Sequence, residues 1–197
     1  MIKIGITGGI GSGKSVVASL FRLLGIPVYI ADDESKRLTN QSLTIRQQLT
    51  THFGEAIYTA EGLNKPLLAN LIFQNPEQLR IVNGIIHPVV KRHFEAWAAR
   101  QVTPLCAIES AILFESGFDK VVDTHLMVYA PLDLRIERAT ARDAASREAI
   151  QRRIKSQMAD EEKCLLADYI IYNDDKQPLI PQITKLVSRL LAEDKTF

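Results

Sequence analysis

A glycine-rich stretch near the N-terminus constrains the fold of this chain more than any other segment. It fits the phosphate-loop pattern of Gly, any four residues and then Gly-Lys-Ser, and its residues are Gly8, Gly9, Ile10, Gly11, Ser12, Gly13, Lys14 and Ser15. The mostly apolar residues 1–6 predict a buried strand before the loop, and residues 15–24 predict a helix after it. A strand, a glycine loop and a helix in this order indicate a site for a nucleoside triphosphate, but they do not identify the acceptor.

The residue types in this loop match what phosphate binding requires. Glycines let the backbone N–H groups from Gly9 to Ser15 converge on phosphate oxygens, and the start of the following helix, which includes Val16, adds partial positive charge. Lys14 is expected to hold the outer phosphates, and the Ser15 hydroxyl is the expected ligand of Mg²⁺. The alternative is a glycine-rich turn with a chance Lys-Ser, and the flanking strand and helix argue against it.

The composition is that of an ordinary globular protein, with 46% hydrophobic and 24% charged residues in a chain of 197. This length allows one sizeable core with inserted subdomains. The formal net charge of +1 provides no general attraction to nucleic acid or to an anionic membrane, so we expect neither as a partner. Cys106 and Cys164 fit no metal or disulfide pattern, and no signal-like apolar run occurs. We therefore expect a cytoplasmic protein that is a monomer or a weak homo-oligomer.

A second short strand is predicted over residues 27–32, with Asp32 at its carboxyl end. Ligands of open parallel sheets bind at this edge, so a carboxylate in this position can take part in chemistry. The alternative is that Asp32 caps the helix that begins at residues 33–35, a role that Asp33 fills equally well. Position alone leaves both interpretations open.

Residues 33–100 follow a helical pattern, and no further strand is predicted among them. Helices are expected over residues 42–53, 64–73 and 75–86. At His87-Pro88 we expect the chain to break and a new helix to begin; His87 is then either a binding residue or a polar residue at a helix boundary. An insert of this size is too long for a simple crossover, so it predicts an acceptor-binding subdomain.

Three more strands complete the predicted core, over residues 104–109, 124–130 and 168–173, and a closing helix covers residues 178–191. Together these elements predict an α/β fold with a five-stranded parallel sheet and three layers, in the manner of phosphate-loop NTPases. This is the plan of a small-molecule kinase. A switch GTPase is disfavoured because the chain has no Asn-Lys-x-Asp motif and no Asp-x-x-Gly after a strand. Motor and remodelling ATPases usually have a clear second acidic strand motif and a longer chain, and Glu109 is the only candidate for that motif here.

One segment is strongly biased toward basic side chains, which are Arg135, Arg138, Arg142, Arg147, Arg152, Arg153 and Lys155. The first three are spaced three and four apart, so they share one helical face. A solvated helix surface is the ordinary interpretation of such a run. The preference for arginine and the position after the fourth strand instead favour a mobile lid that closes over phosphates.

The ordered set of motifs resembles the dephospho-coenzyme A kinases, small-molecule kinases that are similar to nucleoside monophosphate kinases. The resemblance covers nearly the whole chain and rests on residues 7–15, Ala31-Asp32, Ile72-Phe73, Ile86-His87-Pro88, Ile112-Leu113-Phe114-Glu115, Arg138, Arg142-Asp143, Gln157-Met158 and residues 168–173. The chain departs from the family pattern at Ile30, Ala111 and Val16, where relatives often have Asp, Pro and Thr. None of these departures removes a group that the chemistry requires.

The resemblance implies transfer of the γ-phosphoryl group of ATP to the ribose 3′-hydroxyl of dephospho-CoA, the final step of coenzyme A synthesis. It implies that Asp32 accepts the hydroxyl proton and that Asn173 lies near the adenine of ATP. The other implied catalytic residues are Lys14, Arg138 and Arg142. The residues implied to contact the acceptor are Asp32, His87, Pro88, Leu113, Phe114 and Glu115.

We therefore expect three parts in the chain. These are a nucleotide-binding core over residues 1–32, 103–130 and 168–197, a helical acceptor-binding domain over residues 33–102, and an arginine-rich lid over residues 131–167. Two other functions stay open from the residues alone. One is a kinase for another small acceptor, such as a nucleoside monophosphate or shikimate, and the other is a non-catalytic, regulatory ATP-binding protein.

Overall fold

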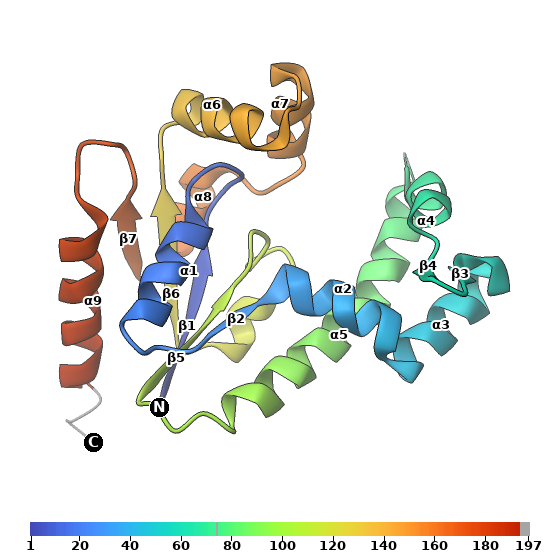
Figure 1. The fold of residues 1–197 in the computed structure, drawn as a ribbon, viewed down its shortest axis with the longest axis horizontal. Helices are drawn as coiled ribbons and strands as arrows, with labels where there is room; N and C mark the ends of the chain where they lie inside the picture. Colours follow the sequence, from blue (N-terminus) through green and yellow to red (C-terminus); the bar gives the residue numbers. More distant parts are fainter. Residues whose placement is uncertain (74, 194–197) are drawn as a thin grey trace. The chain divides into compact units, whose positions relative to one another are not determined.

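The computed structural model describes residues 1–73 and 75–193, and it contains a five-stranded sheet in the order β2-β5-β1-β6-β7 (Figure 1). The strands are β1 (Ile2–Thr7), β2 (Val28–Ile30), β5 (Leu105–Glu109), β6 (Thr124–Tyr129) and β7 (Tyr169–Tyr172). Every pairing between neighbouring strands is parallel. The predicted α/β fold with a five-stranded parallel sheet is therefore confirmed. Gln74 and residues 194–197, which fall inside the predicted domains, lie outside the described residues.

The sheet is buried by apolar side chains, as parallel sheets require. Ile4 and Ile6 of the central strand β1 have no exposed surface. Helices α1 (Lys14–Leu23) and α9 (Leu179–Glu193) pack against each other and share one hydrophobic core with the strands. Helix α1 ends before Gly25, whose φ of 77° is the left-handed conformation that glycine adopts without strain. This core holds β1 and α1 in place, and with them the two ends of the phosphate loop.

The chain divides into two compact units, residues Met1–Ile30 with Ala98–Phe197, and residues Ala31–Trp97. The second unit contains the short 3₁₀ helix η1 (Glu55–Ile57) and, among longer elements, α2 (Ala31–Gln41), α3 (Leu43–Phe53), α4 (Lys65–Ile72) and most of α5 (Pro76–Ala98). Its limits lie within a few residues of the domain that the sequence predicts over residues 33–102. Ser42 and Asn64 cap α3 and α4 by accepting hydrogen bonds from backbone N–H groups.

Two predictions for this unit are wrong. A short antiparallel hairpin, β3 (Tyr58–Thr59) and β4 (Gly62–Leu63), interrupts the region that was expected to be entirely helical. The predicted break at His87-Pro88 does not occur either, because α5 continues through it. Pro88 removes one helix hydrogen bond, but buried residues on both sides, such as Val82 and Val90, keep one continuous apolar face that offsets this loss.

The predicted second strand is shorter than expected. Strand β2 ends at Ile30, and Asp32 lies in the first turn of α2, with Asp33 and Glu34 beside it. Carboxylates are favourable at this end of a helix because their negative charge interacts with the partial positive charge of the helix N-terminus. The placement of Asp32 at a strand end is therefore corrected to the first turn of the following helix.

The arginine-rich segment forms a pair of helices, α6 (Leu132–Asp143) and α7 (Arg147–Lys155), followed by the short α8 (Asp160–Leu166). Ile136, Ala139 and Ile150 form the small core of the α6–α7 pair, and Ile10 of the phosphate loop packs against it. The pair that the sequence identifies as a lid thus touches the phosphate loop through an apolar side chain. Among the described residues, no helix combines the length and apolar character needed to cross a membrane.

Candidate active site

The phosphate loop connects β1 to α1, and close neighbours leave no room for a Cβ at its glycines, Gly11 and Gly13 among them. Gly13 has a φ of 91°, and a Cβ at this position would collide with the side-chain amide of Asn173. Gly11 has a φ of 80°, and a Cβ there would collide with the backbone of Arg135. The Asn173 amide donates a hydrogen bond to the Ser12 carbonyl at 2.8 Å. The loop is therefore held by the segment after β7 and by helix α6.

Lys14 lies where the loop meets the carboxyl end of β5. Its Nζ is 4.0 Å from Glu109 Oε1, and the two side chains are only 11% and 13% exposed. The same Nζ donates to the Gly9 carbonyl at 3.4 Å. The sequence singles out Glu109 as an acidic strand end but does not place it in the site; the sheet register brings it to the lysine of the loop.

The hydroxyl groups of the loop differ in exposure. Ser12 Oγ and Thr7 Oγ1 are buried and have no hydrogen-bond partner in the described part of the chain, and a buried polar atom of this kind needs one. Ser15 and Val16 lie exposed in the first turn of α1. The loop therefore presents one accessible hydroxyl, that of Ser15, at the N-terminus of a helix.

Arg135 holds the phosphate loop, although the sequence assigns it no role beyond the basic segment. It is 4% exposed, donates from Nε to the Ile10 carbonyl at 3.0 Å and forms an ion pair with Asp160. The sequence does not predict its burial, because a run of arginines is ordinarily exposed to solvent. The spacing of three between Arg135 and Arg138 was the only signal that it shares their face.

The two arginines predicted to be catalytic make different contacts. Arg138 donates to the Asn173 carbonyl at 2.9 Å and pairs with Asp175 at 2.5 Å. Arg142 is more exposed and pairs with Asp143, which also pairs with Arg153 of α7. Hydrogen bonds from these two arginines lower the pKa of Asp143 to about 2.

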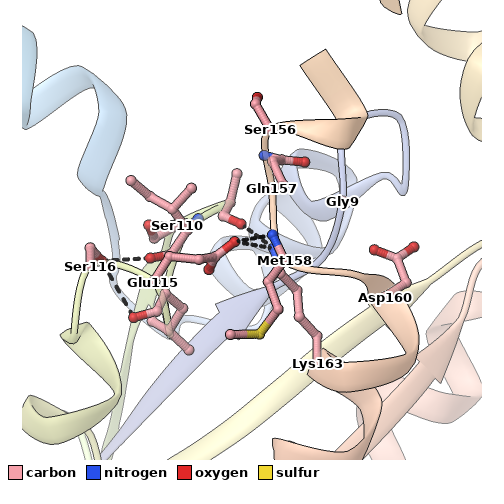
Figure 2. Close-up of polar contacts among 12 residues, drawn as sticks. Gly9, Ser110, Glu115, Ser116, Ser156, Gln157, Met158, Asp160 and Lys163 are labelled. Atoms are coloured by element: carbon pink, nitrogen blue, oxygen red, sulfur yellow. Dashed lines mark hydrogen bonds and ion pairs between the residues drawn. The ribbon is translucent and has the colours of Figure 1, made fainter. Parts of the chain in front are cut away.

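The loop after β5 packs closely on the sheet. Leu113 is fully buried, and its side chain occupies the space beside Gly5. The Phe114 ring lies 5.5 Å from the His125 ring, and hydrogen bonds tie Ser116 back to the carbonyls of Ile112 and Leu113 (Figure 2). Leu113 therefore supports the loop from below, whereas Phe114 and Glu115 are its more accessible side chains.

The remaining predicted site residues belong to the second unit. Asp32 is exposed on α2, and His87 and Pro88 lie in the middle of α5. Burial, followed by the charge of Lys91, lowers the pKa of His87, so its imidazole is neutral at pH 7. Within this unit the structure keeps Asp32 available to solvent and half buries His87.

Comparison with known proteins assigns the family. The sequence profile described as dephospho-CoA kinase matches residues 2–178. The chain belongs to the dephospho-CoA kinase family. The match includes the phosphate loop, the second unit, the loop after β5 and the lid, so membership in this family rests on the whole arrangement and not on the loop alone.

Two curated relatives and one solved structure are similar to this chain over nearly its full length. A protein of Bacteroides fragilis (strain YCH46) named dephospho-CoA kinase is 53% identical over 190 residues, which are 96% of this chain and 93% of that protein. One of Porphyromonas gingivalis with the same name is 45% identical over 188 residues, 95% and 93% of the two chains. The crystal structure of TT1252 from Thermus thermophilus matches with a TM-score of 0.82 and 35% identity, over 98% of this chain and 97% of that one. The resemblance inferred from the sequence, the enzyme class and the kinase fold are confirmed.

Proposed function

We propose that this chain transfers the γ-phosphoryl group of ATP to the ribose 3′-hydroxyl of dephospho-CoA, giving coenzyme A and ADP. The observation that carries the proposal is the phosphate loop with Lys14 beside Glu109, in a chain that matches the dephospho-CoA kinase family over residues 2–178. Phosphoryl transfer requires little covalent chemistry from the protein, so positioning and charge neutralisation are its main tasks.

The donor site is proposed to lie at the loop and its two supports. Backbone N–H groups from Gly9 to Ser15 hold the β- and γ-phosphates, and Lys14 neutralises their charge. Asn173, whose amide already fixes the loop through Ser12, lies near the adenine of ATP. The buried Ser12 hydroxyl, which lacks a partner among the described residues, fits a phosphate oxygen as its acceptor.

Mg²⁺ is proposed as the metal, held by the Ser15 hydroxyl. No cluster of three or more His, Cys, Asp or Glu that could hold a metal ion occurs among residues 1–73 and 75–193. Mg²⁺ fits this arrangement, because it binds through few protein oxygens and completes its octahedron with phosphate oxygens and water. When bound, Mg²⁺ would supply positive charge that offsets the negative charge of the β- and γ-phosphates.

The acceptor residues are proposed from the family to which the chain belongs. Asp32 accepts the proton of the 3′-hydroxyl and orients that oxygen toward the γ-phosphorus. His87, Pro88 and Phe114 contact dephospho-CoA, and Leu113 contributes by holding the loop in place from within the core. Glu115, which the resemblance implies as an acceptor contact, pairs with Lys163 and accepts the backbone N–H of Met158, so we propose that it supports the acceptor loop and does not itself contact dephospho-CoA.

The lid arginines are proposed to neutralise charge on the transferring group. Arg138 is held in place by Asn173, whereas Arg142 reaches the phosphates only by exchanging its partner Asp143. Removal of such an arginine costs about 10³-fold or more in related phosphoryl-transfer enzymes.

A comparison of acceptors tests the proposed function. Purified protein with Mg-ATP is offered dephospho-CoA, AMP and shikimate separately, and ADP release is followed by a coupled assay, with Lys14→Ala as the control for contaminating ATPases. We expect acceptor-dependent ADP with dephospho-CoA alone. Turnover with AMP or shikimate but not with dephospho-CoA would assign another acceptor. No acceptor-dependent ADP at all would favour a regulatory ATP-binding protein.

The proposed setting is the cytoplasm, with the chain acting as a monomer or weak homo-oligomer and without nucleic-acid or membrane partners. Both cysteines are free thiols, and burial raises the pKa of Cys106 to about 11, so it stays protonated. Free thiols are typical of reducing compartments. Sedimentation of the purified protein at several concentrations tests the oligomeric state.

A further inference from the structure

Two buried charges of opposite sign lie on one face of the short helix α8. Asp160 and Lys163 are three residues apart, and their residues are 7% and 0% exposed. Neither belongs to the predicted site. A fully buried lysine is rare unless its ammonium group is paired, so its partners indicate what the helix holds in place.

Lys163 holds the loop that follows β5. Its Nζ donates to the Ala111 carbonyl at 2.7 Å and pairs with Glu115 Oε1 at 3.0 Å. The same Glu115 oxygen accepts the backbone N–H of Met158 at 2.9 Å (Figure 2). The Glu115 carboxylate therefore joins α8 and the segment before it to the loop formed by residues 110–117.

Asp160 holds the phosphate loop. It pairs with Arg135, whose Nε donates to the Ile10 carbonyl at 3.0 Å. The side chain of Gln157, just before α8, accepts a hydrogen bond from the Ile10 N–H at 3.2 Å. The N–H of Ile10 is thus bound by Gln157, just before α8, and its carbonyl is bound by Arg135, the ion-pair partner of Asp160 in α8.

The four charged groups alternate in sign, from Arg135 through Asp160 and Lys163 to Glu115. Burial raises the pKa of Asp160, and the positive charges of Arg135 and Lys163 oppose this rise. Buried ion pairs add little stability compared with well-packed apolar side chains, because their desolvation offsets their attraction. Two such pairs on one short helix, each reaching a different loop, are therefore better explained by the geometry that they enforce than by stability.

We propose that α8 is a positioning element for phosphoryl transfer, in which Asp160 and Lys163 hold the phosphate loop and the 110–117 loop at a fixed separation. This inference rests on the proposed contact of the acceptor with the 110–117 loop. An error of about 1 Å in the relative placement of two reacting groups can cost about 10²-fold in rate. Glu115 then acts on the reaction through Lys163 and Met158, as a positioning residue.

Double-mutant kinetics test this role. Glu115→Gln and Lys163→Met each lower kcat by about 10- to 100-fold, with the KM for ATP changed less than about twofold. The double variant is no worse than the more impaired single variant, because both changes break the same connection. Glu162→Gln, an exposed carboxylate on the same helix, is the matched control and keeps wild-type kinetics.

If Glu115 instead contacted the acceptor directly, Glu115→Gln would raise the KM for dephospho-CoA while Lys163→Met would leave kcat and KM unchanged. That result overturns the proposal. Thermal melting of each variant identifies loss of folding. A single variant leaves one charged partner unpaired, whereas the double variant removes both charges, so its kinetics can be measured even where a single variant is unstable.

Amide hydrogen exchange tests the coupling without turnover. Lys163→Met should increase exchange at residues 110–117, whose Ala111 carbonyl Lys163 binds, and also at Met158 and at Ile10. Unchanged exchange at Ile10 would overturn the role of α8 even if the enzyme is active. A wild-type protein without dephospho-CoA turnover would instead contradict the proposed function and leave this measurement intact.

Discussion

Arg138 of helix α6, part of the proposed lid, donates a hydrogen bond to the main-chain oxygen of Asn173 at 2.9 Å. Asn173 in turn donates from its side chain to Ser12 of the phosphate loop at 2.8 Å. The lid, the segment after β7 and the phosphate loop are therefore connected by one residue. This connection distinguishes Arg138 from Arg142, whose contact lies within the lid.

The two arginines are expected to differ in how they affect the enzyme. Arg138→Ala should lower kcat/KM by about 10³-fold and raise the KM for ATP, because it removes charge and releases the Asn173 segment. Arg142→Ala should lower kcat with little change in the KM for ATP. Arg152→Ala, on the exposed surface of α7, is the control. Steady-state kinetics check this, and a wild-type kcat for Arg142→Ala would remove that residue from the chemistry.

Replacement of Asp32 tests the proposed base. Asp32→Asn should lower kcat by about 10²- to 10⁴-fold while ATP binding, measured by calorimetry, stays nearly unchanged. Asp33→Asn is the matched control, because Asp33 is an exposed carboxylate in the same helix turn and pairs with Lys36. Equal losses in the two variants would indicate that the first turn of α2 matters through its total charge and not through one carboxylate.

Gly13 is expected to be indispensable for a reason beyond its φ angle. Gly13→Ala and Gly25→Ala both place a Cβ in the left-handed region, at a cost of about 1–2 kcal/mol each. Only at Gly13 does the new Cβ also displace Asn173; the surroundings of Gly25 are open. Denaturant unfolding and ATP titration check this. We expect weaker ATP binding, by tenfold or more, for Gly13→Ala alone, and equal ATP affinity of the two variants would contradict it.

The stability of the protein should decrease in mild acid through His87. Because burial and Lys91 lower its pKa in the folded state, neutral His87 contributes stability above its ordinary pKa of 6.5, and this is lost as the pH falls through the folded-state value. Each pKa unit between the folded and unfolded states corresponds to about 1.4 kcal/mol in the free energy of unfolding. Urea unfolding at pH 7.5 and pH 5 should show a smaller loss for His87→Gln than for wild type, whereas exposed His52→Gln should behave like wild type.

The sequence was sufficient for features that depend on local pattern. The phosphate loop, the five strands and the helices α3 and α4 follow from spacing and from the pattern of apolar residues, which act over a few positions. The break at His87-Pro88 was wrong because the proline penalty is local, whereas the buried face of α5 extends to both sides. Local rules therefore fail where packing over a longer stretch outweighs them.

The contacts around α8 could not have been predicted from the sequence. Glu115 lies 48 positions before Lys163 along the chain, and Arg135 lies 25 positions before Asp160. Only the parallel order of β5, β1 and β6 brings these segments together. A lysine and an aspartate three apart on a short helix look like an ordinary exposed pair until their burial is known.

Identification of the reaction product tests the central claim most directly. The protein is incubated with Mg-ATP and dephospho-CoA, and the products are separated and characterised by mass spectrometry and phosphorus NMR. We predict one molecule of coenzyme A, carrying its new phosphomonoester on the ribose 3′-oxygen, for each ADP released. ATP consumption without coenzyme A, or a phosphate on any other oxygen of dephospho-CoA, would contradict the account.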